Sequence, residues 1–244
     1  MTKLSINVNK IAWLRNARGE NRPNLLETSK ILVDCGVDGI TVHPRPDLRH
    51  ITPDDVYDLS NLCKNSNIEF NIEGNPYSEK AKDYPGFIQL VKEIEPDQCT
   101  LVPDSPDQLT SDHGWQIDGK DHNVLINIIE ELKTDKTRVS LFVDPDIKQI
   151  ENIKSIGANR IELYTGPYSL NPIAEVLTSY ETSYHYAKSI GLDVNAGHDL
   201  DLVNLKPFLD RAPVDEVSIG HALISDALID GLDTVTKKYL DLCK

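Results

Sequence analysis

The sequence has little positive charge, few cysteines and no long apolar run. Acidic residues number 39 against 25 lysines and arginines, a formal net charge of −14. The chain therefore lacks the basic face that nucleic acid or an anionic membrane requires. The four cysteines form no CxxC pair, which favours free thiols in a reducing compartment. The stretch MTKLSINVNKIAWL contains no apolar segment of signal-peptide length, so we expect a cytoplasmic protein without nucleic-acid or membrane partners.

What the sequence does contain is an alternation of short β-branched runs and amphipathic helical stretches. A hydrophobic content of 39% over 244 residues is sufficient for one sizeable core. Strands are predicted over 4–9, 39–43, 69–74, 98–103, 138–144, 160–166, 192–197 and 216–220, with helices between them and a last helix over 226–243. Gly36, Gly157 and Gly191 lie where helix C-caps are expected, each shortly before a strand.

The order of these elements predicts the fold class. Strands that alternate with helices predict a parallel sheet, and eight such units predict its closure into a barrel. An open doubly wound sheet is the alternative, but that fold usually has fewer strands and often a GxGxxG turn after the first one, which this sequence lacks. We therefore predict an α/β protein with a single (β/α)8 TIM barrel and residues 1–244 in one domain.

Polar residues gather at the ends of the predicted strands, where barrels carry their active sites. They are Asn7, Asn9, Lys10, His43, Arg45, Glu73, Glu162, His198 and His221. In the first three strands the polar residues share one parity and the apolar residues the other, so the polar sets should face the barrel axis. Each residue by itself is more often structural, but carboxylates and imidazoles collected at one mouth beside cations are typical of a proton-transfer site.

The basic residues indicate the kind of ligand. In an acidic protein, a cluster of Lys10, Arg18, Arg45, Arg49 and His50 is typical of a pocket for a small anion, most often phosphate. The SIGHALISDAL segment (218–228) leads from the eighth strand into a helix, whose first N–H groups can bind phosphate, and the NAGHDL turn (195–200) is similar.

Two other patterns have alternative interpretations. His43, Glu73, His198 and His221 could bind a divalent metal ion, although the neighbouring arginines and lysine would repel it. Asp144 and Asp146, in LFVDPD, are expected to cap the helix that follows rather than to bind a metal.

Several stretches resemble the pyridoxine 5′-phosphate synthase family of vitamin B6 biosynthesis. They are NVNKIAWLRNARG, DGITVHPRPDLRHIT, NIEGN, TLVPDSPDQLTSDHGW, VSLFVDPD, RIELYTGPY, GLDVNAGHDL and EVSIGHALISDAL, and they cover nearly the whole chain in order. The resemblance implies a (β/α)8 barrel that condenses 1-deoxy-D-xylulose 5-phosphate with 3-amino-2-oxopropyl phosphate to pyridoxine 5′-phosphate, phosphate and water. It also implies no cofactor or metal, and a homo-oligomer, expected to be an octamer.

The resemblance assigns roles to residues of this sequence. His43 and Glu73 would accept protons, His198 would donate one, and Glu162 would stabilise a charged intermediate. The aminoketone phosphate would be held by Asn7, Arg18, Gly220 and His221, and the deoxyxylulose phosphate by Arg45, His50 and Thr110.

Some residues depart from the pattern of the family. Asn9 and Lys10 stand where many members have Asp-His, and Asp199 stands where Gly is usual. We expect Lys10 to contact a phosphate or carbonyl group, and Asp199 to point away and offer only its backbone N–H. The loop 44–53 is interpreted as a candidate lid in which Arg49 is only solvated.

Two further functions remain open at this point. A phosphosugar isomerase or aldolase on the same barrel would need one phosphate site rather than two. A phosphometabolite-binding protein would need the basic residues but not four groups for proton transfer, so the presence of His43, Glu73, Glu162 and His198 together favours an enzyme.

Overall fold

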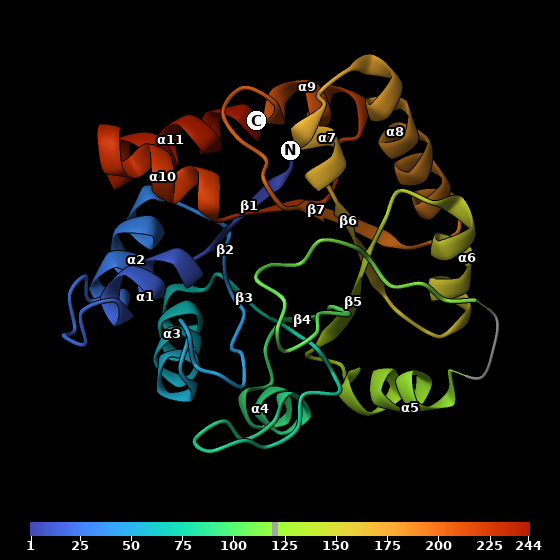
Figure 1. The fold of residues 1–244 in the computed structure, drawn as a ribbon. Coiled ribbons are helices and arrows are strands. Elements are labelled where there is room, and N and C mark those ends of the chain that lie inside the picture. The colour runs from blue at the N-terminus through green and yellow to red at the C-terminus, as the bar shows by residue number, and fades with distance from the viewer. Residues whose placement is uncertain (119–121) are drawn as a thin grey trace.

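A closed barrel of parallel strands forms the centre of the molecule (Figure 1). The structure is a computed structural model that describes residues 1–118 and 122–244. Within these residues eight strands pair in chain order, and the last closes on the first. They are β1 (Lys3–Asn7), β2 (Gly39–Val42), β3 (Glu69–Gly74), β4 (Gln98–Leu101), β5 (Arg138–Val143), β6 (Arg160–Tyr164), β7 (Asp193–Gly197) and β8 (Glu216–Ile219). The predicted (β/α)8 barrel is confirmed.

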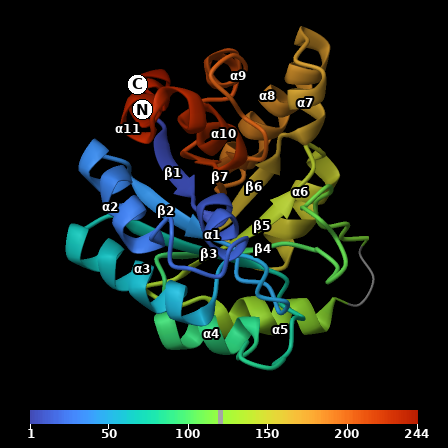
Figure 2. The same ribbon diagram turned by 60° about the vertical axis from the view of Figure 1, so that its left-hand side comes forward.

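Helices surround the barrel on the outside (Figures 1 and 2). They are α1 (Asn9–Asn16), α2 (Leu25–Cys35), α3 (Pro53–Ser66), α4 (Phe87–Ile94), α5 (Asn123–Leu132), α6 (Ile147–Ser155), α7 (Gly166–Leu170), α8 (Ala174–Ser189), α9 (Leu205–Arg211), α10 (His221–Asp230) and α11 (Leu232–Leu242). The two chain ends meet, because the Thr2 N–H donates to the Cys243 carbonyl at 3.1 Å. Within the described residues, no helix has both the length and the apolar character needed to cross a bilayer.

The alternation of polar and apolar residues along the strands places the core. Ile6, Ile40 and Ile72 are fully buried on the outward parity, beneath the helices. The inward parity is polar and hydrogen-bonded from strand to strand: Ser5 Oγ lies 2.8 Å from Thr41 Oγ1, and Asn71 Nδ2 donates to Thr41 Oγ1 at 3.4 Å. The prediction that the polar sets of the first three strands face the barrel axis is confirmed for these residues.

Capping residues that are recognisable in the sequence mark several helix ends. Gly36, Gly157 and Gly191 have φ values of 93°, 95° and 75°, the left-handed conformation predicted for them. Thr52 and Asp55 form a capping box at the start of α3, in which the Thr52 side chain accepts from the Asp55 N–H and the Asp55 carboxylate accepts from the Thr52 N–H.

Several boundaries differ from the sequence prediction, and three of the differences add or divide a helix. The first strand ends at Asn7 instead of continuing to residue 9, because Val8 (ψ 9°) turns the chain into α1, a helix that was not predicted. The predicted last helix is two helices, which Gly231 separates at φ 87° and ψ 145°. A short helix, α7, begins inside the predicted sixth strand.

The prediction for the two aspartates after β5 was half right. Asp146 caps α6, since its Oδ1 accepts from the N–H groups of Lys148 and Gln149 at 2.7 and 3.1 Å. Asp144 does not cap this helix. Its Oδ2 instead accepts from the Gly114 N–H at 3.3 Å and so anchors the long connection that follows β4.

Candidate active site

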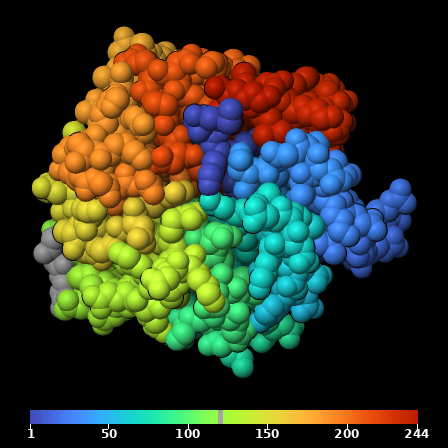
Figure 3. Space-filling view, turned by 180° about the vertical axis from the view of Figure 1, so that it is seen from behind, coloured from blue at the N-terminus to red at the C-terminus, as the bar shows by residue number. Residues whose placement is uncertain are grey.

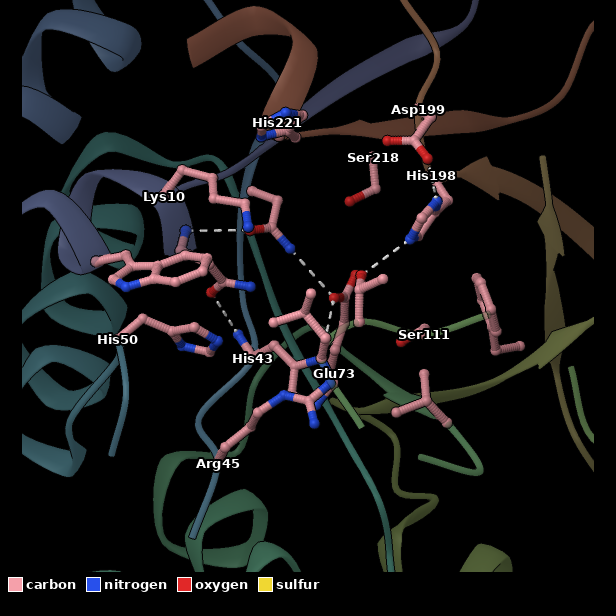
Figure 4. Close-up of a pocket in the computed structure, with 18 of the residues that line it drawn as sticks. Lys10, His43, Arg45, His50, Glu73, Ser111, His198, Asp199, Ser218 and His221 are labelled. Atoms are coloured by element: carbon pink, nitrogen blue, oxygen red, sulfur yellow. Dashed lines mark hydrogen bonds and ion pairs between the residues drawn. The ribbon is translucent and has the colours of Figure 1, made fainter. Parts of the chain in front are cut away.

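A cavity of about 380 Å³ opens at the carboxyl ends of the strands. It is lined by Asn7, Asn9, Lys10, Trp13, His43, Arg45, Arg49, His50, Glu73, Val102, Leu109, Thr110, Ser111, Phe142, Glu162, His198, Asp199, Ser218, Gly220 and His221. The barrel thus brings together every site residue predicted from the sequence except Arg18. Figure 4 shows the labelled side chains converging on this space from different elements.

Arg18 lies away from the cavity. Its side chain is exposed, in the segment between α1 and α2 that projects from the body of the molecule (Figures 1 and 3). Lys10, in the first turn of α1, does line the cavity, with its Nζ 4.3 Å from the centre of the Trp13 ring. Burial, assisted by Arg45 and Arg49, lowers the pKa of Lys10, and Asp199 opposes this shift.

The loop after β2 supplies a buried basic surface, His43, Arg45, Arg49 and His50, which we call the basic wall. Arg45 forms an ion pair with Asp104 and donates to the Gln108 carbonyl at 3.3 Å. Arg49 donates to the carbonyls of Gln108 and Pro106 at 3.1 and 3.2 Å. The prediction that Arg49 is only solvated was wrong, because the connection after β4 folds over the wall and supplies these acceptors.

Hydrogen bonds hold the backbone of His43 and the ring of His50 in the basic wall. Asn9 Oδ1 accepts from the His43 backbone N–H at 2.9 Å, and His50 Nδ1 accepts from the Ile51 N–H at 2.9 Å. Burial lowers the pKa of His43 well below its usual value and that of His50 to about 3, and Arg45 adds to both shifts. At neutral pH both rings are therefore uncharged.

Three buried carboxyl groups, Glu73, Glu162 and Glu216, form what we call the acidic floor. Burial is the main cause that raises their pKa values: to about 8 for Glu162, to about 7 for Glu216 and well above its usual value for Glu73. Neighbouring carboxylates strengthen the shifts of Glu73 and Glu162.

Glu73 and Glu162 differ in their contacts. Glu73 Oε2 accepts from Asn7 Nδ2 at 3.2 Å and lies 3.9 Å from His43 Nδ1. Glu162 Oε2 is buried and has no hydrogen-bond partner among the described residues. Gly197 makes room for this side chain, since a Cβ there would lie 2.3 Å from Glu162 Oε1. A buried carboxyl oxygen without a partner is costly, so a ligand group is expected to complete this site.

His198 and Asp199 occupy a strained turn after β7. Both have positive φ values, 92° and 57°, a conformation that costs non-glycine residues about 1–3 kcal/mol. α7 and the residue before it hold the turn: Thr165 Oγ1 donates to the Gly197 carbonyl at 2.7 Å, and Ser169 Oγ donates to the Asp199 carbonyl at 2.6 Å. Strain of this kind is found where a side chain must be presented to a ligand.

The Asp199 carboxylate turns toward the His198 ring (Figure 4), with Oδ2 2.8 Å from Nδ1. The expectation that Asp199 points away was wrong. The oxygen lies off the N–H direction, so the contact is electrostatic rather than a directed hydrogen bond. The His198 ring is the main cause that lowers the pKa of Asp199. On its other side, His198 Nε2 lies 3.0 Å from Thr110 Oγ1.

Several polar residues of the site were missed by sequence reasoning. Asp104 follows β4 and pairs with Arg45, while Ser218 and Glu216 lie on β8 with the same parity as Gly220. The alternation that located the polar residues of the first three strands would have located Ser218 and Glu216, had it been applied to the eighth. Asp104 carries no such signal, because it lies beyond the end of its strand.

The divalent metal site that the sequence left open as an alternative has no set of ligands in the described residues. Within residues 1–118 and 122–244, no three His, Cys, Asp or Glu side chains gather closely enough to hold a metal ion.

The fold and the cavity define a class of protein: a (β/α)8 barrel whose mouth combines anion-binding groups with groups for proton transfer. Solved structures of the same fold include thiamine phosphate pyrophosphorylase from Pyrococcus furiosus (TM-score 0.64, 11% identity, covering 99% of this chain and 95% of that one). Phosphoribosyl anthranilate isomerase from Thermotoga maritima is another (TM-score 0.63, 11% identity, covering 100% and 98%). At these identities the likeness concerns the fold.

Comparison with protein families is more specific. Residues 4–244 match the model of the pyridoxal phosphate biosynthesis protein PdxJ, and the chain belongs to this family. Relatives include pyridoxine 5′-phosphate synthase from Xylella fastidiosa, which is 48% identical over 99% of this chain and 94% of that protein. The enzyme of the same name from Porphyromonas gingivalis is 48% identical over 99% and 98%.

Proposed function

We propose that this chain condenses 1-deoxy-D-xylulose 5-phosphate with 3-amino-2-oxopropyl phosphate to pyridoxine 5′-phosphate, inorganic phosphate and water. One observation carries the proposal: a single cavity collects His43, Glu73, Glu162 and His198 in a chain that is 48% identical to pyridoxine 5′-phosphate synthases. Ring closure joins two substrates and expels water and phosphate, so protons must move at every step. This requirement explains why one cavity holds so many groups that can exchange protons.

The two phosphates are assigned to different parts of the cavity. Arg45 and His50 of the basic wall, with Thr110, bind the phosphosugar. Asn7, Gly220 and His221 bind the aminoketone phosphate, and His221 is the first residue of α10, where backbone N–H groups have no partner within the helix. Arg18 belongs to this second group only through the family resemblance, because its side chain lies outside the cavity.

The acid–base roles follow from the protonation states in the cavity. His43 is neutral and can accept a proton. Glu73 is a neutral acid while the cavity holds no cation, and an amine or imine cation beside it would lower its pKa and turn it into a proton acceptor. Glu162, whose Oε2 is unpartnered among the described residues, would stabilise the same cation. The role of His198 as proton donor comes from the family resemblance.

The test is the reaction itself. Purified protein is supplied with both substrates, and pyridoxine 5′-phosphate and inorganic phosphate are measured by mass spectrometry and a phosphate assay. We expect equal amounts of the two products and none when either substrate is omitted. Absence of product with both substrates present would overturn the assignment. Turnover of the phosphosugar without its partner would favour an isomerase or aldolase, and binding without turnover would favour a phosphometabolite-binding protein.

The domain, the assembly and the location of the protein remain part of the proposal. We treat residues 1–244 as one catalytic domain in the cytoplasm, as expected from the sequence, and as the subunit of an octamer, as the family resemblance implies. Light scattering coupled to size-exclusion chromatography measures the assembly, and a mass of one 27.3 kDa chain would contradict it.

A further inference from the structure

A second set of side chains lies directly behind the basic wall, outside the residues that line the cavity. It consists of Arg15 and Asn16, at the end of α1, and Asp55, in the first turn of α3. We call these three residues the brace. Two of them belong to the LRNARG segment (14–19), from which the proposed function uses only Arg18.

The brace is a dense hydrogen-bond network. Arg15 binds both Asp55 carboxylate oxygens, and its Nε donates to Asn16 Oδ1 at 2.9 Å. The Arg15 and Asp55 side chains are only 12% and 13% exposed. A two-point guanidinium–carboxylate pair that is shielded from water is stronger and more rigid than an ion pair on the surface. The Asp55 carboxylate also accepts from the Thr52 N–H at 2.8 Å, so the network joins α1 to the start of α3.

The brace ends on the backbone of the basic wall. Arg15 Nη2 and Asn16 Nδ2 donate to the His50 carbonyl at 3.1 and 2.8 Å. Asn16 Nδ2 also lies 3.3 Å from the Arg49 carbonyl. Three donor contacts from one helix end thus fix the backbone of two consecutive residues whose side chains line the cavity.

The orientation of His50 explains why its backbone needs this support. Its Nδ1 accepts from the Ile51 N–H, so the neutral ring carries its proton on Nε2. A neutral Nε2–H binds a phosphate oxygen by direction and distance rather than by charge, and its contribution depends on where the ring is held.

We propose that the brace positions His50 for the phosphate of the phosphosugar, so that Arg15 and Asn16 set the affinity for this substrate without touching it. The identity of the substrate rests on the proposed function, but binding can be measured without turnover. Arg15 and Asn16 are positioning residues. A brace that only stabilised the fold would lower thermal stability and affect both substrates alike.

Two variants separate these possibilities. Asn16→Ala removes the Asn16 donor to both carbonyls and leaves the Arg15–Asp55 pair. Arg15→Met removes the pair with Asp55 and one donor to the His50 carbonyl, and it leaves the Asn16 contacts. The matched control is Arg211→Met, which breaks the ion pair of Arg211 with Glu181, remote from the brace in sequence and absent from the cavity lining. KM for each substrate and kcat are measured, together with the Kd of 1-deoxy-D-xylulose 5-phosphate by calorimetry in the absence of the aminoketone and Tm by thermal unfolding.

We expect Asn16→Ala to raise the KM and Kd of the phosphosugar about three- to tenfold, because the His50 backbone loses a contact that holds the ring in place. Arg15→Met should raise them more, because it loses a contact to the His50 carbonyl and also the buried pair with Asp55 that joins α1 to α3. KM for the aminoketone phosphate and kcat should change less than about twofold. The control should match the wild type in all five quantities.

Other results would overturn the proposal. An unchanged phosphosugar Kd in a variant with reduced Tm would make the brace purely structural, and an equal rise of both KM values would also overturn the proposal. If Arg15→Met does not fold, Asn16→Ala decides. If the wild type binds the phosphosugar but forms no product, the proposed reaction fails while the Kd comparison still decides the brace. If the wild type binds neither the phosphosugar nor inorganic phosphate, both fail.

Discussion

Glu73 and Glu162 of the acidic floor line the same cavity as the basic wall, yet burial acts on the two regions in opposite directions. In the wall, Arg45 pairs with Asp104 and Arg49 with backbone carbonyls, and the two guanidinium charges add to burial in lowering the pKa values of His43 and His50. In the floor, burial raises the pKa values of the three carboxyl groups, and Arg160 opposes the shifts of Glu162 and Glu216. The usual order is therefore inverted: burial favours the protonated form of these acids and the uncharged form of the two imidazoles of the wall.

Because of this inversion, the wall and the floor suit different groups of the substrates. The wall offers fixed positive charge and neutral donors, which suit a phosphate. The floor offers groups that ionise only when a cation arrives, which suits an imine intermediate. The following predictions test whether the two regions act separately, beginning with the largest expected effect.

Removal of the Glu73 carboxyl should abolish proton transfer at the floor. Glu73→Gln keeps the shape and loses the acid, so we expect kcat to fall by roughly 10²–10⁴-fold, the range for loss of a general acid or base. The control is Glu69→Gln, on the same strand but paired with Lys3 and Arg138 and absent from the cavity lining. Product formation under saturating substrates measures the effect, and a Glu73→Gln enzyme of near-normal kcat would contradict the role.

Glu162 should make the stability of the protein depend on pH. Its pKa is raised from 4.5 to about 8. The protonated group therefore contributes stability that is fully present below pH 4.5 and is lost as the pH rises to about 8. Glu162→Gln lacks this dependence, so its free energy of unfolding should exceed that of the wild type at pH 8 by on the order of 4 kcal/mol. Denaturant unfolding between pH 5 and pH 8.5 checks this, and parallel pH profiles for the two proteins would contradict it.

Arg45 should affect binding rather than chemistry. Arg45→Lys keeps the charge but loses the planar fork that joins Asp104 to the cavity, so KM for the phosphosugar should rise about tenfold while kcat changes less. Arg211→Lys is the matched control on the surface. A fall in kcat at unchanged KM would place Arg45 in the chemistry instead and would remove the separation between wall and floor.

The smallest effect is expected at Asp199. Asp199→Asn keeps the size of the side chain and removes the charge next to His198 Nδ1. Because the contact is not a directed hydrogen bond, we expect kcat to fall only about three- to fivefold. Asp210→Asn, which affects a surface pair with Lys206, serves as the control. An unchanged kcat would show that the turn after β7 orients His198 without this carboxylate.

Much of the fold and of the site could be predicted because the patterns are local. Strand parity along LSIN, GITV and EFNIEG located Asn7, Thr41 and Glu73, and the cluster around residue 45 indicated an anion pocket. The same parity would have located Ser218 and Glu216. Local patterns worked at these positions because a strand in a barrel has only two faces, and one of them must be apolar.

Other features depended on contacts between distant segments. β1 ends at Asn7, because the Val8 N–H donates to the Thr41 carbonyl and Asn9 Oδ1 accepts from the His43 N–H. α1 therefore begins at Asn9, a residue that the strand pattern includes in the strand. The direction of Asp199 follows from the turn that Thr165 and Ser169 hold. The position of the Arg15 side chain depends on its hydrogen bonds with the Asp55 carboxylate, 40 residues away in the chain.

The sequence by itself determined the eight-fold alternation of strand and helix, and with it the barrel and the residues that reach its mouth, because side-chain periodicity is a property of neighbouring residues. Only the tertiary structure decided which of those residues are charged and which are paired. A pKa depends on burial and on neighbouring charges, and distant segments supply both here. Burial raises the pKa of Glu73 on β3, and the carboxyl groups of Glu162 on β6, Asp104 after β4 and Glu216 on β8 add to the shift.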